Sequence, residues 1–196
     1  ETKTSYTATV TASDGVNSAT QNITVNVTNI NDTPVMTSSA SFSANENQTA
    51  IGTVTATDDE NETLTYTLSG TDSSSISINS SSGVMTFNSA PDYETKTSYA
   101  VTVAISDGTN STTQNITVNV VNLNDNSPSI TSSATFSAAE NQISIGTVTA
   151  TDADGDTLTY SLSGTDASSM SINSGSGVLT FNSAPDYETK TSYTAT

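Results

Sequence analysis

The sequence predicts an all-β protein made of tandem seven-stranded Greek-key β-sandwich modules, and three observations support this. First, the segment ETKTSY starts at residues 1, 94 and 188, so the chain repeats after 93 residues and again after 94. This unit is too long for a helical solenoid repeat and matches a small globular module. Second, apolar residues alternate with Ser, Thr and Asn, as in half-buried strands. Third, Gly, Asn, Asp and Ser clusters separate these runs, as turns require.

A single length difference between the two periods predicts where the modules are joined. It lies in the stretch NDTPVMTSS, which corresponds to NDNSPSITSS one period later. Insertions collect between modules rather than within strands, so this Asn, Asp and Pro-rich stretch is the predicted linker. The predicted organisation is the C-terminal part of a module at 1–30, a complete module at 35–121, and the N-terminal two-thirds of a module with the start of its closing strands at 129–196.

Within the complete module, seven short strands are expected from the period-two patterning. Their inward-facing residues would form a small core made largely of β-branched side chains, so stability is expected to depend on whatever binds the acidic residues. The expected strands cover residues 40–44, 51–57, 64–69, 76–79, 84–88, 98–105 and 116–120. The expected core residues are Phe42, Val54, Leu64, Tyr66, Ile76, Ile78, Phe87, Tyr99, Val101, Val103, Ile116 and Val118.

The composition narrows the class of partner. Three lysines oppose twenty acidic residues, which gives a net charge of -17. Nucleic acid and anionic membranes bind through Lys and Arg, so neither is an expected partner. No apolar run approaches the roughly 20 residues that span a bilayer. The chain contains no Cys, which excludes a disulfide framework and makes bound metal the expected source of rigidity for an extracellular module.

Most acidic residues fall in five short motifs at fixed module positions: AxEN, TDxD/E, PDYE, SDGxN and the linker NxND. A surface that served only solubility would spread its acids over the outer strand faces. Oxygen ligands without His or Cys favour Ca²⁺ over zinc or copper. The predicted calcium-binding residues are Glu1, Asp14, Asn29, Asn31, Asp32, Glu46, Asp58, Glu60, Asp92, Glu94, Asp107, Asn122, Asn124, Asp125, Asn126, Glu140, Asp152, Asp154, Asp186 and Glu188.

Taken together, these motifs resemble the calcium motifs of the cadherin repeat over the whole chain. The segment TDADGDTLTYSLSG at 151–164 is also similar to the cadherin-like modules of large bacterial surface adhesins. The resemblance implies that the AxEN and PDYE acids lie at the bottom of one module, that the TDxD/E and SDGxN acids lie at the top of the next, and that the linker lies between them. It also implies a location outside the cell, at the cell surface.

The sequence departs from the cadherin pattern at the linkers. Asn29 and Asn122 stand where the family has Asp, and the first linker is one residue shorter than the second. In the PDYE motif, Tyr93 and Tyr187 replace the family's arginine. We therefore expect fewer ions or weaker affinity at the first linker.

Three function classes follow from this reading. The leading one is a non-enzymatic, calcium-stiffened spacer of a long adhesion protein, whose partners are neighbouring modules of the same protein. The second is an extracellular filament in which residues 1–30 of one copy complete the open sandwich of another by strand complementation. The third is an enzyme or a carbohydrate binder. Catalysis would need a carboxylate pair, and every such pair repeats in register as structural ligands do, so an enzyme is not expected. A carbohydrate binder would usually show an exposed aromatic platform, whereas the aromatic residues here lie mostly in alternating core positions.

Attached glycans are a further expectation, although many sequons arise by chance in a chain so rich in Asn, Ser and Thr. The Asn-x-Ser/Thr sequons lie at Asn22, Asn26, Asn47, Asn61, Asn79, Asn110 and Asn115.

Overall fold

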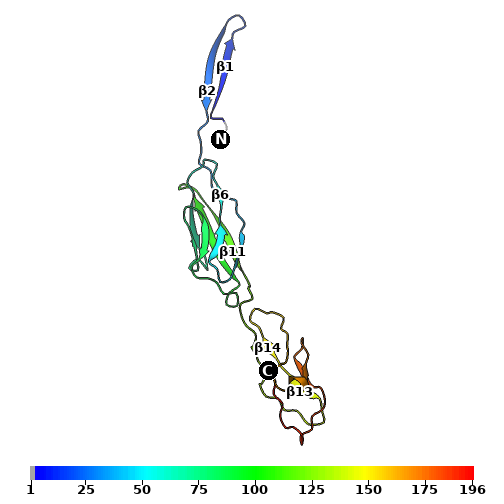
Figure 1. Ribbon diagram of the computed structural model, residues 1–196. Coiled ribbons are helices and arrows are strands. Elements are labelled where there is room, and N and C mark those ends of the chain that lie inside the picture. Colours follow the sequence, from blue (N-terminus) through cyan, green and yellow to red (C-terminus); the bar gives the residue numbers. More distant parts are fainter. Residues whose placement is uncertain (1–2) are drawn as a thin grey trace. The chain divides into compact units, whose positions relative to one another are not determined.

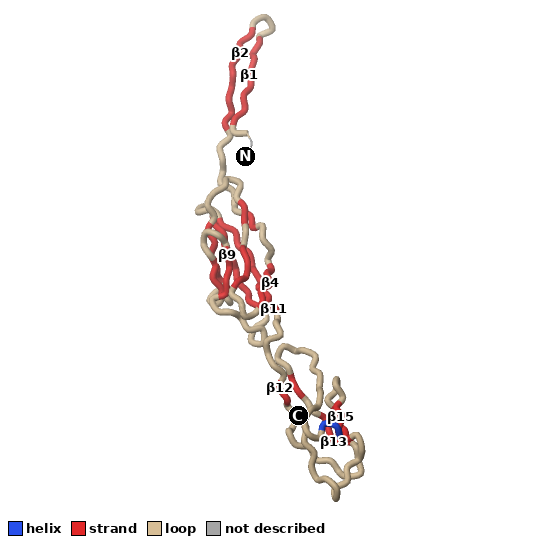
Figure 2. Tube along the Cα trace, in the orientation of Figure 1, coloured by secondary structure: helices blue, strands red, loops and turns tan. Residues whose placement is uncertain are grey.

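The computed structural model describes residues 3–196 and divides the chain into two compact units, Glu1–Val121 and Asn122–Thr196 (Figure 1). Within the described range, the helical content is one 3₁₀ turn, η1 (Ala167–Ser169), and the other elements are strands (Figure 2). No helix in residues 3–196 has the length and apolar character needed to cross a bilayer. The all-β prediction is confirmed.

The first unit begins with a long β-hairpin. Strand β1 (Ser5–Ser13) runs antiparallel to β2 (Ser18–Asn26), and all nine residues of each strand are paired. Every residue of both strands is exposed, including the alternating apolar ones. The hairpin therefore has the patterning of a half-buried pair of strands without a covered face in the described residues of this unit.

Residues 35–121 form a complete β-sandwich, and its larger sheet has four strands. Three neighbouring strands pair antiparallel, whereas the edge strand β4 pairs parallel with β11. This parallel pair is the long-range connection that closes the Greek key. In spatial order, the strands of the sheet are β4 (Ser41–Asn45), β11 (Ser111–Val121), β10 (Ser98–Ser106) and β7 (Thr65–Ser69).

The opposite sheet has three antiparallel strands, in the order β5 (Ala50–Thr53), β9 (Val84–Phe87) and β8 (Ile76–Ile78). A short ladder of two residues joins β3 (Val35–Met36) to β6 (Ala56–Thr57).

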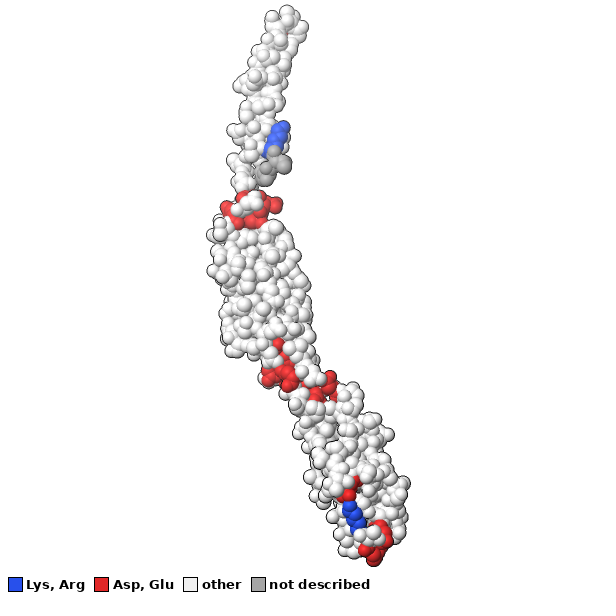
Figure 3. All heavy atoms as spheres, in the orientation of Figure 1, with Lys and Arg blue, Asp and Glu red and all other residues white. Residues whose placement is uncertain are grey.

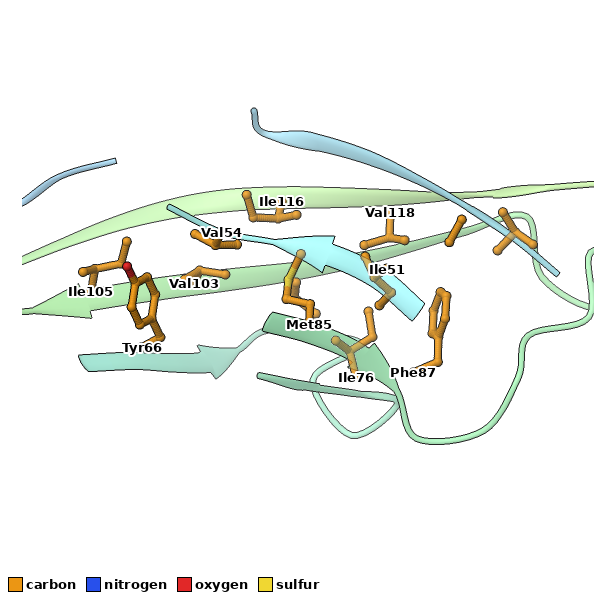
Figure 4. Close-up of a cluster of buried hydrophobic side chains, with 13 residues drawn as sticks. Ile51, Val54, Tyr66, Ile76, Met85, Phe87, Val103, Ile105, Ile116 and Val118 are labelled. Atoms are coloured by element: carbon orange, nitrogen blue, oxygen red, sulfur yellow. The ribbon is translucent and has the colours of Figure 1, made fainter. Parts of the chain in front are cut away.

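The core lies between these sheets, where inward-facing residues of both interdigitate (Figure 4). Eight of the twelve expected core residues are buried. The other four, Phe42, Leu64, Ile78 and Tyr99, are partly buried and pack against the same cluster. The expectation missed five buried residues, namely Ala44, Ile51, Met85, Ile105 and Val120.

One strand expectation was wrong in detail, because residues 51–57 form two strands rather than one. The chain leaves β5 at Thr53 and enters β6 at Ala56, and between them the fully buried Val54 donates its N–H to the carbonyl of Gly83 at 2.9 Å. A Cβ on Gly83, whose φ is +71°, would come within 2.2 Å of the Val54 carbonyl oxygen. The crossing from one sheet to the other therefore depends on a glycine in the facing turn.

The second unit contains only part of this architecture. A two-residue ladder joins β12 (Ser129–Ile130) to β14 (Ala150–Thr151). A three-stranded sheet has the order β13 (Ser144–Thr147), β16 (Val178–Phe181) and β15 (Met170–Ile172). The buried residues of this unit are Met170, Leu179 and Phe181, with Phe136, Ile145, Leu162, Ile172 and Tyr193 packed against them.

Candidate metal-binding sites

On the face of the complete sandwich that Figure 3 shows, acidic residues gather at the two ends and the side between them carries almost none. Each end is built from loops that leave the strands, so the strands determine which carboxylates meet. We call the end that holds the AxEN and PDYE motifs the lower end and the end that holds the linker, TDxD/E and SDGxN motifs the upper end.

At the lower end, Glu46 is 1% exposed and is the one buried acidic residue among residues 3–196. It directly follows β4, and its N–H donates to the carbonyl of Val121 at 3.1 Å, which ties the loop to the end of β11. Its carboxylate accepts the N–H of Tyr93 at 2.8 Å and lies within 4.8 Å of the Glu94 carboxylate. A buried carboxylate beside a second one is the arrangement that a bound cation stabilises.

The PDYE loop presents Asp92 and Glu94 on one tight turn. The carboxylate of Asp92 accepts the N–H of Glu94 at 3.0 Å and the hydroxyl of Thr95 at 2.8 Å. The Thr95 hydroxyl is the main cause that lowers the pKa of Asp92 below its ordinary value, although some desolvation opposes it. Asp92 is therefore held in its charged form, as a calcium ligand must be.

The lower end of the second unit repeats this arrangement. Carboxylate oxygens of Glu140, Asp186 and Glu188 all lie within 4.8 Å of one another. Tyr187 donates its N–H to Glu140 at 3.2 Å, and the Thr189 hydroxyl lowers the pKa of Asp186. These three acids are exposed, whereas Glu46 of the first unit is buried.

At the upper end of the complete sandwich, the first linker is hydrogen-bonded to the module that follows it. The Asn31 amide donates to Asp107 at 2.8 Å, and the Asp32 N–H donates to Glu60 at 3.1 Å. In return, the Asn110 amide donates to the carbonyl of Asn31 at 3.0 Å. Side chains of the linker and of the TDxD/E and SDGxN motifs thus hold the linker beside the acids of these motifs.

Asp107 shows how the SDGxN turn prepares a carboxylate. Partial desolvation raises the pKa of Asp107, but hydrogen bonds from the backbone N–H groups of Asn110 and Thr109, both at 2.6 Å, outweigh it and leave the pKa lowered. The opposite shift occurs at Glu62, whose pKa is raised by desolvation and then by the negative charges of Asp107, Asp58 and Glu60. The upper end is therefore a region of negative potential that attracts a cation.

The second unit builds its linker in the same way. Asn122 donates its amide to the carbonyl of Asp154 at 2.9 Å, and the Asn126 N–H donates to the Asp154 carboxylate at 2.8 Å. The Asp125 N–H donates to the same carboxylate at 3.2 Å, and the Asn124 amide donates to Asp156. Three residues of this linker, Asn122, Asp125 and Asn126, therefore donate hydrogen bonds to Asp154.

Several predicted ligand oxygens at the upper ends are buried without a hydrogen-bond partner. Among residues 3–196, seven buried side-chain polar atoms lack one, and four of them are oxygens of predicted calcium ligands. A buried oxygen without a donor is costly, and a Ca²⁺ ion supplies what it lacks. These residues therefore fit a hard cation with oxygen ligands. The four atoms are Asn31 Oδ1, Asp58 Oδ2, Glu60 Oε1 and Asn122 Oδ1.

The structure adds two acids, Asp156 and Glu62, that lie outside the five motifs. Carboxylate oxygens of Asp152, Asp154 and Asp156 lie within 4.8 Å of one another. Asp156 corresponds to Glu62 one module earlier, whose pKa is raised by desolvation and then by the negative charges of the upper-end acids. Alternating acids in the run DADGD were the signal that could have identified Asp156.

Two predicted ligands, Asn29 and Asp14, are not brought into these clusters, and a third lies outside the described residues. Asn29 is exposed, and in the described residues no hydrogen bond ties its side chain to the upper-end acids, unlike its counterpart Asn122. Asp14 lies in the turn of the β1–β2 hairpin, where the backbone N–H of Asn17 lowers its pKa. Glu1 lies outside the described residues.

Two other acids outside the motifs, Asp72 and Asp166, form ion pairs away from these clusters. Asp72 forms an ion pair with Lys96, and Asp166 forms the matching pair with Lys190 in the second unit. The hydrogen bond from Lys96 is the largest cause of the lowered pKa of Asp72. Asp72 also accepts the N–H of Ala100 at 2.8 Å, so this turn is attached to β10 and is no part of the clusters.

Comparison with known proteins defines the class of this fold. Residues 38–121 match the family model of the cadherin domain. The chain has the all-β cadherin-domain fold, in tandem modules with acidic clusters at the linkers. Cadherin domains are extracellular, non-enzymatic adhesion modules, in agreement with the expectation that the chain is not an enzyme. No curated protein sequence matches the chain.

Solved cadherin ectodomains resemble the chain over most of its length. Domains 3–6 of protocadherin gamma B2 align with a TM-score of 0.75 and 26% identity over 93% of this chain. Domains 22–24 of mouse cadherin-23 align with a TM-score of 0.67 and 22% identity over 94% of it. The chain spans 51% of the first structure and 65% of the second. Domains 1–2 of human protocadherin-24 align with a TM-score of 0.68 and 23% identity over 82% of each chain.

Proposed function

We propose that the chain supplies calcium-stiffened spacer modules of a long cell-surface adhesion protein and has no catalytic activity of its own. The observation that supports this most is the set of buried ligand oxygens without partners at the upper ends, which also hold the linkers. In the cadherin pattern, such sites determine whether neighbouring modules move independently or as one body.

In this proposal, ligands at the upper end of each module act with the lower-end acids of the module before it. In the first unit, Asp58, Glu60 and Asp107 would bind the ion together with the Asn31 amide oxygen. Bound Ca²⁺ would neutralise carboxylates that otherwise repel one another. The linkers would then be stiff with calcium and flexible without it.

A finer assignment, to the adhesins of bacterial surfaces, is proposed only on the TDADGDTLTYSLSG segment at 151–164. The solved structures that resemble the chain are protocadherins and cadherin-23. Closely similar tandem modules, with no platform of exposed aromatics in residues 3–196, fit a spacer better than a ligand-binding tip.

The test is calcium titration of the whole chain by calorimetry, combined with small-angle X-ray scattering in calcium and in EDTA. We expect heat of binding, a longer maximum dimension in calcium, and easier proteolysis at residues 29–35 and 122–129 in EDTA. The double substitution Asp152→Asn and Asp154→Asn should remove part of the heat. Asp72→Asn combined with Asp166→Asn removes the same charge outside the clusters and is the matched control. Scattering that a chelator leaves unchanged would overturn the proposal.

An extracellular filament is the second candidate function. It is favoured by one specific pair of features, the exposed hairpin β1–β2 and an apolar groove in the second unit.

A further inference from the structure

The basic residues of this acidic chain all lie close to predicted calcium ligands. The chain has three lysines and no arginine, and each lysine is the third residue of an ETKTSY segment. Lys96 therefore follows the predicted ligand Glu94 by two residues, and Lys190 follows Glu188 in the same way. An ammonium group that pairs with a ligand carboxylate weakens the attraction of that carboxylate for a metal ion. The position of these ammonium groups therefore matters for the candidate sites.

The turn at Asp92 brings Lys96 into the position from which such a pair normally forms. The Lys96 N–H donates to the carbonyl of Asp92 at 2.9 Å, which is the hydrogen bond of one helical turn. Oppositely charged side chains four residues apart on a helical turn are neighbours and attract each other. The second unit repeats this turn, because the Lys190 N–H donates to the carbonyl of Asp186 at 3.0 Å. Asp92 and Asp186 are therefore the partners that local structure offers to the two lysines.

The structure pairs both lysines with a different carboxylate. The Lys96 ammonium contacts Asp72, and the Lys190 ammonium contacts Asp166. Both aspartates precede their lysine by 24 residues and belong to an SGTD turn, outside the five acidic motifs. Each aspartate side chain is 13% exposed, so the carboxylate end of the pair is partly shielded from water. In both units, a long-range ion pair thus takes the place of the local one.

Strand β10 fixes the two groups that hold the Lys96 ammonium. The carboxylate of Asp72 accepts the N–H of Ala100 at 2.8 Å, and the Asp72 N–H donates to the Ala100 carbonyl at 3.1 Å. The ammonium also lies 4.5 Å from the centroid of the Tyr99 ring, within the range of cation–π attraction. This ring packs edge to face on Phe87, with 5.0 Å between centroids. The lysine head group is therefore held by a carboxylate and a ring that have fixed positions of their own.

The second unit has the same two contacts. The carboxylate of Asp166 accepts the N–H of Thr194 at 2.8 Å, and the Lys190 ammonium lies 4.7 Å from the centroid of the Tyr193 ring. That ring packs edge to face on Phe181, again with 5.0 Å between centroids. The contacts recur at the same positions of the repeated sequence, so they are a property of the module and not of one loop.

We propose that Asp72 and Tyr99 hold the Lys96 ammonium away from the lower-end ligands, so that calcium binds these carboxylates without competition from the protein's own cation. The same arrangement acts on Lys190 in the second unit. This role rests on the proposed calcium binding and adds residues outside the five motifs to those that determine the affinity. Without Asp72, the ammonium can take its local partner, Asp92. Asp72 is thus a positioning residue, which acts on the ligands through Lys96.

The first experiment is a calcium titration of the whole isotope-labelled chain, followed by NMR at the Tyr93 amide. This amide lies between two predicted ligands and donates to Glu46. Asp72→Asn should weaken calcium binding at this amide about three- to tenfold, as expected when one positive charge approaches the ligands. The ligands themselves are intact, so the same number of ions should bind at saturation. Asp72→Asn combined with Lys96→Gln removes the released cation and should restore the wild-type affinity.

Two further variants separate this role from a general charge effect and from support of the loop. Asp72→Asn combined with Lys3→Gln restores the same net charge but leaves Lys96 released, so it should bind as weakly as Asp72→Asn alone. Lys96→Gln by itself should bind at least as tightly as the wild type. Weaker binding by Lys96→Gln would overturn the proposal, because the lysine would then support the ligand loop. Failure of Lys96→Gln to rescue Asp72→Asn would overturn it as well.

Proton NMR in EDTA gives a readout that does not depend on calcium. The Lys96 ammonium lies over the Tyr99 ring, so the ring current should shift the signals of the adjacent Hε protons upfield from those of an unfolded lysine. Asp72→Asn should remove much of this shift and leave the Lys190 signals in place. Lys96 signals that are unshifted in the wild type, or that Asp72→Asn leaves unchanged, would refute the proposal. A wild-type chain without any calcium response would overturn the spacer function and this role together, whereas normal calcium binding by Asp72→Asn would overturn this role alone.

Discussion

Residues 41–45 and 135–139 read SFSAN and TFSAA, and only the first segment forms a strand. Residues 65–69 and 159–163 differ in the same way, although TYTLS and TYSLS are nearly identical. By contrast, the three-stranded sheets of the two units share the same strand order and the same register shift, at Ala50/Gly52 and Ser144/Gly146. The segments that differ are those whose partners are β10 and β11. Strand formation in this protein is therefore decided by the neighbouring strand more than by local propensity.

The largest expected contrast concerns the aromatic core. Phe87 is 3% exposed and packs edge to face on Tyr99, and Phe181 repeats this contact with Tyr193 at 9% exposure. Phe87→Ala should lower the free energy of unfolding of the complete sandwich by about 3–5 kcal/mol. Phe181→Ala should lower the free energy of unfolding of the second unit less, because Phe181 lines an apolar groove whose walls can relax after the substitution. Urea unfolding followed by circular dichroism measures both, and equal losses would contradict the comparison.

Glycine turns in the two units should respond alike. A Cβ on Gly83 or Gly177 would lie 2.2 or 2.1 Å from the carbonyl oxygen of Val54 or Val148, and both glycines have positive φ. We expect Gly83→Ala and Gly177→Ala each to lower the free energy of unfolding by about 1–3 kcal/mol, since the same clash occurs in both units. Gly108→Ala is the control for backbone strain alone, because Gly108 also has a positive φ, +99°, but its Cβ would meet open space. Calorimetric melting temperatures of the three variants give the comparison; an unaffected Gly177→Ala would contradict it.

The lower-end glutamates should differ because only one is buried. In EDTA, Glu46→Ala leaves the Tyr93 N–H without its acceptor and should lower the free energy of unfolding by about 1–3 kcal/mol. Glu140→Ala removes a longer bond from an exposed residue and should cost less. Glu46→Gln retains an acceptor and should restore most of the stability, but not calcium affinity. Chemical denaturation in EDTA, with calorimetry in calcium, separates the two roles.

The smallest expected effect is a dependence on pH at the Lys96–Asp72 pair. The pKa of Asp72 lies below its ordinary value of 3.8 in the folded chain, mainly because Lys96 donates to its carboxylate. Its contribution to stability is therefore present above pH 3.8 and is lost as the pH falls below it. Asp72→Asn should reduce the loss of stability between pH 5 and pH 3, as measured by urea midpoints. High salt should weaken the effect, because Lys96 is 42% exposed at its side chain. A midpoint shift that is the same in both proteins would remove Asp72 as its source.

Much of the fold could be predicted because it is encoded by short-range patterns. Period-two alternation identified β10 and β11, and repeated turn motifs located the acidic loops. The two-residue strand β3 is too short to leave a periodic signal, and the break at Val54 depends on the facing Gly83. Within the candidate sites, the burial of Glu46 could not be predicted, because its partners Val121 and Tyr93 come from far along the chain. Asp156 could have been found from its spacing alone.

The sequence by itself determined the module length, the strand patterning and the residue types at each acidic position, because these are local properties that recur at a fixed period. Only the tertiary structure decided which carboxylates meet, which ligand oxygens are left without a donor, and which strand-like segments become strands. Those outcomes need backbone partners and packing surfaces from far along the chain. Among the described residues, segments 135–139 and 159–163 have no such partner strands in their unit and form no strand.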